Sequence, residues 1–444
     1  MRGVQRYWCE RAWLGGENAE DGVLVSIEGD RIAAVERDVT SPPAGSTRLG
    51  GLVLPGLANA HSHAFHRALR GRTQRGRGSF WSWRERMYEV AERLDPDSYL
   101  RLARATFGEM ALAGITAVGE FHYLHHGPGG TPYDDPNAMG KALIAAAAEA
   151  GIRITLLDTC YLHGGIGEEP DETQRRFSDG DASRWAERAG ELTAAGGSRI
   201  GAAIHSVRAV DPEAMKAVVG WAADRRCPLH AHLSEQPAEN ETCEAAFGVS
   251  PTRLLADADA LSERFTAVHA THLSEADVGL LGGSGCCCCF CPTTERDLAD
   301  GIGPARELLD AGASLSLGSD SHAVIDLLEE ARAVELDERL ATNERGRHGA
   351  GVLLEAATAA GHASIGWPEA GRIEPGAIAD LVSVRLDSVR TAGAGDDIDA
   401  AVFAATASDV ETVISAGRTI VSGGRHAALD VPAELSAAIA EVTG

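Results

Sequence analysis

Short apolar runs recur along this chain, and stretches with helical spacing lie between them. The alternation of strand and helix continues over about 300 residues, which predicts a parallel α/β architecture. A closed (β/α)8 barrel fits the number of units, and an open doubly wound sheet is the alternative. The predicted strands lie at residues 115–121, 153–157, 200–204, 228–232, 265–269 and 313–318, and the clearest helical patterns at 96–113, 137–150 and 212–224.

The two ends of the chain carry another pattern, in which short apolar strands alternate with Gly-containing turns. Residues 22–35 form a strand, a Gly-Asp turn and a second strand, which is typical of a β-hairpin. Residues 371–384 and 412–421 show the same pattern of short apolar strands and Gly-containing turns. We therefore expect a small β-sandwich domain, built from both chain ends, beside a TIM-like barrel. The expected divisions are 1–52 for its N-terminal part, 53–370 for the barrel and 371–444 for its C-terminal part.

Composition and charge narrow the classes of function. The 444 residues carry a formal net charge of −25, which argues against nucleic acid as a partner because phosphates need a basic face. There is no run of about 18 apolar residues, so we expect no membrane span. The N-terminal residues lack the apolar core of a signal peptide, and we expect a cytoplasmic protein. Nine cysteines, an odd number, favour reduced thiols over a disulfide framework.

The first candidate chemistry follows the apolar run 52–54, which leads to His61 and His63. Side chains alternate along a strand, so two histidines one residue apart point to the same side. Two imidazoles on one side of a strand end can hold a metal ion, although this pair does not choose between Zn, Fe, Ni and Cu. Two unrelated surface histidines are the alternative when the pair is taken alone.

Polar residues end several later strands in the same way. In a (β/α)8 barrel the reactive side chains come from the carboxyl ends of the strands, so these residues are expected to meet. Neutral imidazoles and a carboxylate bind a divalent ion and leave a position for water, whose pKa falls to about 7. Glu235, three residues after His232, is placed to move protons, and His269 to polarise the group under attack. The strand-end residues are His61, His63, His205, His230, His232, Glu235, His269, Asp320 and His322.

This set of strand ends resembles the mononuclear deaminase branch of the amidohydrolase superfamily. Its pattern is His-x-His after the first barrel strand, His-x-x-Glu after the fifth, His after the sixth and Asp after the eighth. Binuclear branches place a carbamylated Lys at the end of strand four, where residues 205–208 contain no Lys. The resemblance implies that Glu235, His269 and Asp320 act in catalysis. It also implies one divalent ion, with Zn expected, held by His61, His63, His232 and Asp320.

Four further stretches resemble the formimidoylglutamate deiminases, and that likeness covers almost the whole chain. The stretches are residues 80–88, 119–126, 205–210 and 291–295. The resemblance implies hydrolysis of N-formimino-L-glutamate to N-formyl-L-glutamate and ammonia in histidine degradation, through a metal-bound hydroxide. It implies a homodimer whose small-molecule substrate is a dianionic glutamate derivative. The substrate-binding residues that it implies are His66, Arg84, Tyr123, His205 and Arg208.

Arg84 and Arg208 agree with a substrate that carries two carboxylates, since guanidinium groups grip carboxylates bidentately. A surface ion pair with Glu85 or Glu89 is the alternative for Arg84. The alternative activities are deamination of guanine, cytosine or N-formimino-L-aspartate. The two arginines discriminate between these substrates, because a neutral base needs no arginine pair and a shorter diacid would lose one contact. A metal-free barrel that acts as a scaffold or binding protein is the alternative outside the enzymes.

Two features depart from the family pattern. Position 66 is His where Gln is expected, so the charge at this position would vary with pH. Cys286 to Cys289 occupy an expected apolar strand. Consecutive strand residues point to opposite faces, so four adjacent thiolates cannot converge on one ion, and small buried hydrophobes are the favoured interpretation.

Overall fold

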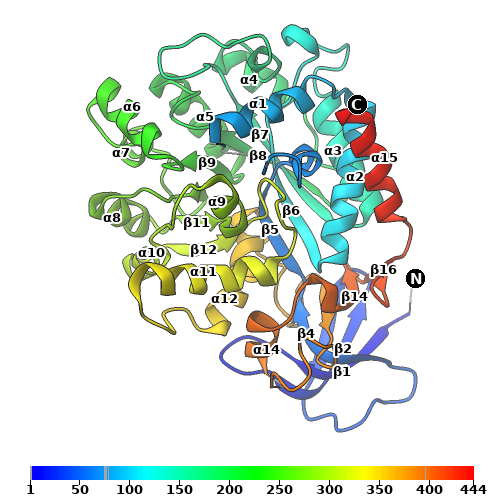
Figure 1. Cartoon of the computed structure of the whole chain (residues 1–444). Helices are drawn as coiled ribbons and strands as arrows, with labels where there is room; N and C mark the ends of the chain where they lie inside the picture. Colours follow the sequence, from blue (N-terminus) through cyan, green and yellow to red (C-terminus); the bar gives the residue numbers. More distant parts are fainter. Residues whose placement is uncertain (1–2, 75–77, 79, 396) are drawn as a thin grey trace.

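The computed structural model describes residues 3–74, 78, 80–395 and 397–444, and its strands form two sheets (Figure 1). Eight strands of one sheet pair in parallel and in chain order, and an isolated parallel bridge between Ser62 and Asp320 joins the last to the first. This closure confirms the predicted barrel. The strands are β5 (Leu57–Ser62), β6 (Ile115–His122), β7 (Arg153–Cys160), β8 (Ser198–Ile204), β9 (Leu229–Leu233), β10 (Phe265–His269), β11 (Cys287–Phe290) and β12 (Ser314–Leu317).

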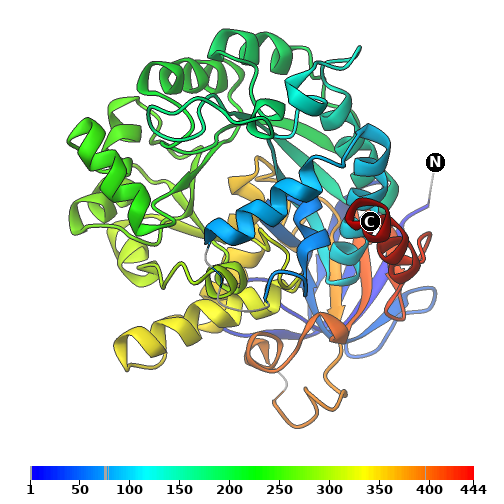
Figure 2. The ribbon, with the colours of Figure 1, turned by 45° about the horizontal axis from the view of Figure 1, so that its top comes forward.

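Helices connect the barrel strands and cover their outer side (Figures 1 and 2). Local sequence signals place their first residues: α2 and α5 both begin at a proline, after Asp95 and Asp211, whose carboxylates accept backbone N–H groups of the first turn. The helices are α2 (Pro96–Leu112), α3 (Ala138–Ala150), α4 (Ala182–Gly190), α5 (Pro212–Arg225), α6 (Pro237–Phe247), α7 (Pro251–Asp257), α8 (Glu275–Gly283), α9 (Pro292–Leu298), α10 (Ala305–Ala311), α11 (Leu327–Thr342), α12 (Ala350–Ala357) and α13 (Ala359–Ser364).

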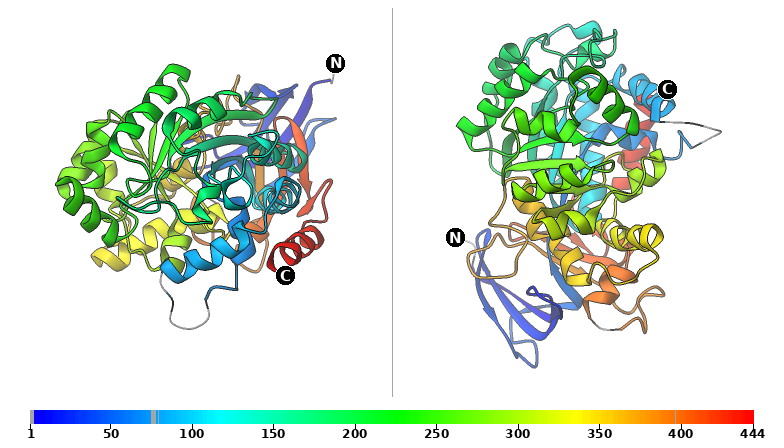
Figure 3. Two further views of the ribbon diagram at one scale, coloured as in Figure 1. Left: turned by 90° about the horizontal axis from the view of Figure 1, so that it is seen from above. Right: turned by 90° about the vertical axis from the view of Figure 1, so that its left-hand side faces the viewer.

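The second sheet combines both ends of the chain, as the sequence predicts. Its hydrogen-bonded order is β16-β15-β14-β13-β4-β1-β2-β3, and the antiparallel pair β4–β13 joins the N-terminal strands to the C-terminal ones (Figure 3). The predicted hairpin is β2 paired with β3. The strands are β1 (Gln5–Ala12), β2 (Glu20–Glu28), β3 (Arg31–Glu36), β4 (Thr47–Pro55), β13 (Leu381–Val384), β14 (Val410–Ser415), β15 (Arg418–Ser422) and β16 (Arg425–His426).

The chain passes from the second sheet into the barrel at Gly56, between β4 and β5. A side chain cannot fit at this crossing, because a Cβ on Gly56 would lie 2.2 Å from Thr116 Oγ1 and 2.7 Å from Asp380 Cβ. Asp380 also accepts two hydrogen bonds from the buried guanidinium of Arg153, at 2.5 and 3.0 Å. This bidentate pair fixes the base of the barrel against the second sheet, and it places β5 so that its carboxyl end points away from that sheet.

The remaining elements lie at the rim and at the C-terminus. Helix α1 (Phe80–Ala91) crosses the carboxyl end of the barrel (Figure 2), and the 3-10 turn η1 (Ala64–Leu69) leads toward it. The last helix packs its apolar side against α2. No described helix is long and apolar enough to cross a membrane. The other elements are η2 (Pro128–Gly130), η3 (Gln174–Arg176), α14 (Ile398–Phe403), η4 (Ala407–Asp409) and α15 (Val431–Thr443).

Candidate active site

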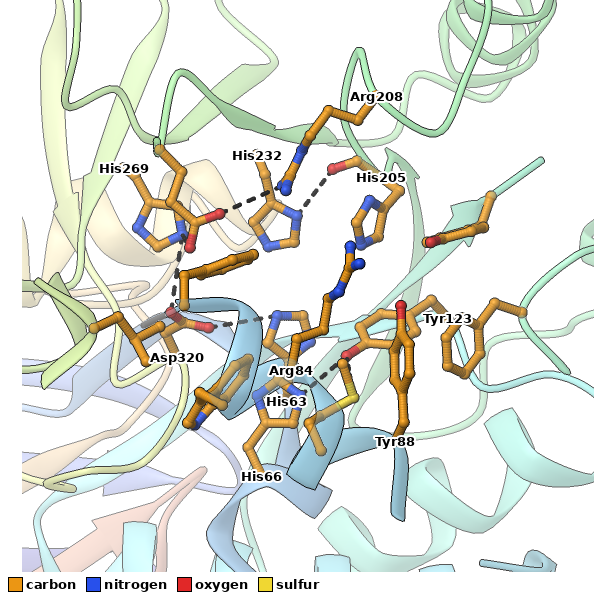
Figure 4. Close-up of a pocket in the computed structure, with 17 residues that line it drawn as sticks. His63, His66, Arg84, Tyr88, Tyr123, His205, Arg208, His232, His269 and Asp320 are labelled. Atoms are coloured by element: carbon orange, nitrogen blue, oxygen red, sulfur yellow. Dashed lines mark hydrogen bonds and ion pairs between the residues drawn. The ribbon is translucent and has the colours of Figure 1, made fainter. Parts of the chain in front are cut away.

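A cavity opens at the carboxyl end of the barrel (Figure 4). It brings together residues that lie far apart in the sequence and that end different strands. Every substrate-binding residue that the sequence predicts lines this cavity. The lining residues are His63, His66, Phe80, Trp83, Arg84, Met87, Tyr88, Tyr123, Tyr161, Phe177, His205, Arg208, His232, Glu235, His269, Leu298 and Asp320.

The predicted metal ligands converge at the floor of this cavity. The His61 Nε2 atom lies 3.1 Å from His232 Nε2 and 3.4 Å from Asp320 Oδ1. His63 Nε2 lies 3.4 Å from the same oxygen of Asp320. All four side chains are buried. Four groups therefore point at one small volume: one imidazole in β5, one just after it, a third in β9 and a carboxylate from beyond β12.

The hydrogen bonds behind these imidazoles show that the donor set suits a cation. His63 Nδ1 lies 2.9 Å from the Phe121 carbonyl, and His232 Nδ1 lies 2.9 Å from the His205 carbonyl. A carbonyl oxygen only accepts, so each Nδ1 carries the proton and each Nε2 of a neutral ring presents a lone pair. Burial lowers the pKa of His63 to about 3, which keeps that ring neutral as a ligand must be. A divalent ion held by these lone pairs would remove their mutual repulsion.

Three carboxylates surround His269, which ends β10. Its Nδ1 lies 3.3 Å from Glu295 Oε1, and its Nε2 lies 3.7 Å from Glu235 Oε1 and 3.8 Å from Asp320 Oδ2. Burial alone would lower the pKa of His269, but these negative charges raise it well above the ordinary value. His269 therefore has an N–H on the side facing Glu235 and Asp320, held in orientation by Glu295 on the other side.

The backbone at three of these positions is left-handed although no glycine is present. Ser234, His269 and Asp320 have φ angles of +49°, +68° and +39°. Such conformations cost about 1–3 kcal/mol each and persist only where the surrounding structure imposes them. They turn the chain sharply at the ends of β9, β10 and β12, so that the functional side chains point into the barrel mouth.

Arg84 reaches the cavity from α1, and Arg208 reaches it from the segment after β8, from opposite sides in Figure 4. The Arg84 guanidinium lies against the rings of Trp81 and Tyr88, at 4.5 and 5.6 Å from their centroids. Among the described residues it has no carboxylate partner. The surface ion pair considered for Arg84 forms instead at Arg86, which lies 2.8 Å from Glu89.

Arg208 is already in contact with two carboxylates. Its Nη2 donates to Glu235 Oε2 at 3.4 Å, and its Nε lies 3.1 Å from Glu239 Oε2. The bond to Glu235 is long for a charge-assisted hydrogen bond, so an anionic ligand could replace it. Arg208 therefore links the proposed proton donor to the wall of the cavity.

The aromatic side of the cavity holds the other predicted substrate residues. His66 Nε2 lies 3.0 Å from Tyr123 Oη, and the buried Nδ1 of His66 has no partner among the described residues. Burial lowers the pKa of His66 and of His205 well below the ordinary value. Both rings are therefore neutral around pH 7, so the charge variation considered for His66 is absent near neutrality.

Three buried glutamates in this region have no role in the sequence-based set: Glu120, Glu239 and Glu295. Glu120 sits in a strand that is buried along its whole length, and an ionisable residue inside such a strand is the signal that could have identified it. Its Oε1 accepts the Ala64 N–H at 2.6 Å, and its Oε2 lies 2.5 Å from Ser62 Oγ. Glu120 thus binds the residue on each side of His63, through the Ser62 hydroxyl and the Ala64 backbone N–H.

Glu120 also makes stability depend on pH. Burial raises the pKa of Glu120 from 4.5 to about 8. The contribution of protonated Glu120 to the free energy of unfolding is therefore fully present below about pH 4.5 and is lost as pH rises through about 8. E120Q keeps the shape and stays neutral. Between about pH 5 and 9 its Tm is expected to rise by a few degrees relative to the unmodified protein. Thermal unfolding across this range measures the difference, with the exposed E187Q as control, and parallel Tm curves for E120Q and the unmodified protein would contradict the assignment.

A second buried group, His122, His125 and Asp158, also has the composition of a metal site. The Asp158 carboxylate already accepts two hydrogen bonds from Arg188, both at 2.9 Å, and one from Trp185 Nε1. A cation bound there would lie beside the guanidinium, and the like charges would repel each other in a buried site. We therefore interpret this group as part of the hydrogen-bonded core.

The cysteine run forms β11, and all nine cysteines of the chain are free and buried. Burial raises the pKa of Cys287 to about 11, so this thiol stays protonated. The prediction of small buried side chains in a barrel strand is confirmed.

Comparison with known proteins adds independent information. The sequence model of the Amidohydrolase family matches residues 52–420. The chain is 38% identical to a formimidoylglutamate deiminase of Pseudomonas aeruginosa, over 93% of this chain and 91% of that protein. It is 31% identical to a 5-methylthioadenosine/S-adenosylhomocysteine deaminase of Natronomonas pharaonis, over 86% of this chain and 84% of that protein.

Solved structures agree with the fold. An amidohydrolase from Brucella melitensis is 33% identical and superposes with a TM-score of 0.90, covering 99% of this chain and 100% of that one. A zinc complex of an atrazine chlorohydrolase from Arthrobacter aurescens is 25% identical, with a TM-score of 0.87 and coverage of 98% and 100%. The relatives carry more than one activity, so the substrate has to be argued from the cavity of this chain.

Proposed function

Because this chain belongs to the amidohydrolase family, we propose that it is a metal-dependent deiminase that hydrolyses N-formimino-L-glutamate to N-formyl-L-glutamate and ammonia. The observation that carries the proposal is the position of Arg84 and Arg208. Both line the cavity that also contains His63, His232 and Asp320. A purine or pyrimidine base offers nothing for two guanidinium groups to neutralise, whereas a glutamate derivative offers two carboxylates.

His61, His63, His232 and Asp320 would hold the ion, and we propose zinc because three imidazoles and one carboxylate suit it. The zinc-bound atrazine chlorohydrolase is a relative of similar architecture. A divalent ion supplies Lewis acidity and an acidified water at neutral pH. A formimino carbon placed beside this centre would then receive the water oxygen.

Three side chains of the cavity divide the proton transfers. Asp320 accepts the proton that the attacking water loses, and His269 donates a hydrogen bond from Nε2 to the developing tetrahedral group. Glu235, which lies beside both His269 and Arg208, delivers a proton to the departing nitrogen. Asp320 then passes its proton to the same nitrogen, the C–N bond breaks and ammonia leaves. Glu235 recovers a proton from the hydroxyl group as the formyl C=O forms on the glutamate nitrogen.

The direct test is ammonia release by the purified, zinc-loaded protein. The substrates compared are N-formimino-L-glutamate, N-formimino-L-aspartate, guanine, cytosine and 5′-methylthioadenosine. We expect rapid release from the glutamate compound, and slower release from the aspartate compound because its shorter chain cannot reach both arginines. Release from a base or nucleoside alone would keep the metal centre and overturn the substrate assignment.

Arg84 offers a second test of the same assignment. R84M removes the guanidinium but keeps much of the apolar stem that lies against Trp81. The KM for N-formimino-L-glutamate is expected to rise on the order of 10–100-fold, as for loss of a hydrogen bond to a charged group. Steady-state kinetics measure this change. The control is R86M, two residues along the same helix, where Arg86 is exposed and pairs with Glu89. An unchanged KM in R84M would remove Arg84 from substrate binding.

A further inference from the structure

We propose that Glu239 is a positioning residue: it orients Arg208 for a substrate carboxylate and keeps Glu235 free to transfer a proton. The inference rests on the proposed function and assigns a role to a residue that lies outside the predicted site. It is carried by two contacts, one from each oxygen of the Glu239 carboxylate.

The first contact fixes the segment that presents Glu235. Glu239 lies in the first turn of α6 and is 2% exposed. Its Oε1 accepts the backbone N–H of Ser234 at 3.0 Å. Ser234 directly precedes Glu235 and has a left-handed φ of +49°, a conformation that a serine adopts only under constraint. The hydrogen bond from Glu239 supplies part of that constraint at the residue before the proposed proton donor.

The second contact fixes the guanidinium. Glu239 Oε2 lies 3.1 Å from Arg208 Nε, while Arg208 Nη2 donates to Glu235 Oε2 at 3.4 Å. Arg208 thus stands between two carboxylates, with the shorter contact to Glu239. Figure 4 shows its side chain extending into the pocket beside His232. The contact with Glu239 is an ion pair without hydrogen-bond geometry, and its attraction draws the guanidinium toward Glu239 before substrate binds.

The charges explain why both contacts are needed. A buried guanidinium requires a negative partner, and Glu239 supplies one that takes no part in the reaction. Without it Glu235 would be the nearest carboxylate, and the 3.4 Å contact would tighten into a strong ion pair. Glu235 would then be held against Arg208, away from the departing nitrogen, and Arg208 would be less available to the substrate.

The test uses the zinc-loaded full-length protein and three substrates. These are N-formimino-L-glutamate, N-formimino-4-aminobutyrate, which lacks the α-carboxylate, and N-formimino-L-2-aminobutyrate, which lacks the γ-carboxylate. E239Q keeps one acceptor oxygen and cannot serve both Ser234 and Arg208. E239D keeps the charge on a shorter side chain. E241Q, on the exposed face of the same helix, is the matched control.

We expect E239Q to lower kcat/KM for N-formimino-L-glutamate on the order of 10–100-fold, as for small misplacements of catalytic groups. The kcat/KM for N-formimino-L-glutamate is divided by that for each of the two monocarboxylates. One of these two ratios should be lower in E239Q than in the unmodified protein, and the carboxylate missing from that monocarboxylate is the one that Arg208 binds. E239D should recover part of the loss, and E241Q should behave as the unmodified protein.

A merely structural role gives a different result. Partial unfolding of E239Q would lower turnover of all three substrates by the same factor and leave both ratios unchanged, and that outcome would overturn the inference. So would unchanged kinetics in E239Q. If the unmodified protein releases ammonia from none of the three compounds, the proposed function fails and this inference fails with it, whereas unchanged ratios in an active enzyme overturn the inference alone.

Discussion

An E235Q variant is expected to lose kcat by about 10²–10⁴-fold while it keeps its zinc, since that is the range a positioned proton donor contributes. Glu235 lies 3.7 Å from His269 Nε2 and 3.4 Å from Arg208 Nη2, beside the metal-ligand cluster and outside it. Glutamine has the same shape and can still accept the hydrogen bond from Arg208. It cannot deliver a proton to the departing nitrogen. Steady-state kinetics measure the loss of kcat, and the zinc content of the same preparation shows whether the metal is kept.

The matched control for E235Q is E244Q, a glutamate of the neighbouring helix that is exposed and far from the chemistry. Retention of kcat in E235Q would remove Glu235 from the mechanism. Loss of zinc together with activity would instead make Glu235 part of the metal centre.

A D320N variant is expected to lose both activity and metal. The Asp320 Oδ1 atom lies 3.4 Å from the Nε2 atoms of His61 and His63. The Asp320 carboxylate is the one negatively charged group among the four proposed ligands. Loss of the proton acceptor alone lowers turnover by about 10²–10⁴-fold. Loss of a charged ligand weakens metal binding in addition, because the three imidazoles that remain are neutral.

The measurement for D320N is zinc content after dialysis, followed by activity in the presence of added zinc. We expect reduced zinc after dialysis and no recovery of turnover when zinc is restored, since the proton acceptor stays absent. D310N, at an exposed aspartate of α10, is the control. Full zinc content and turnover in D320N would show that the proposed ligand set is wrong.

Strand geometry explains why much of this site could be predicted. Residues that alternate along an extended backbone share a face, so His61 and His63 were assigned to one side of a strand end before any tertiary contact was known. The carboxyl ends of parallel strands meet at one face of a barrel, which brings His232, His269 and Asp320 to the same place. These arguments need only the local period of each strand and the closure of the sheet.

Burial explains why other residues were missed. Glu239 and Glu295 lie in short helices among polar neighbours, where a glutamate is ordinarily a solvated surface residue. Their partners, Arg208 and His269, come from other segments, and only packing shows that both glutamates are buried. Their assignment to the site therefore comes from the fold.

By itself the sequence determined the barrel, the second sheet from both chain ends, and the strand-end residues from which a metal site is proposed, because hydrophobic period and strand polarity are local properties. The tertiary structure alone decided how Arg208 is shared between Glu235 and Glu239. It also decided that Arg84 faces aromatic rings and that Asp320 turns into the site with a left-handed backbone. These features depend on which charged groups are buried beside one another and on whether the surrounding contacts stabilise a strained backbone. Both are properties of the packed molecule.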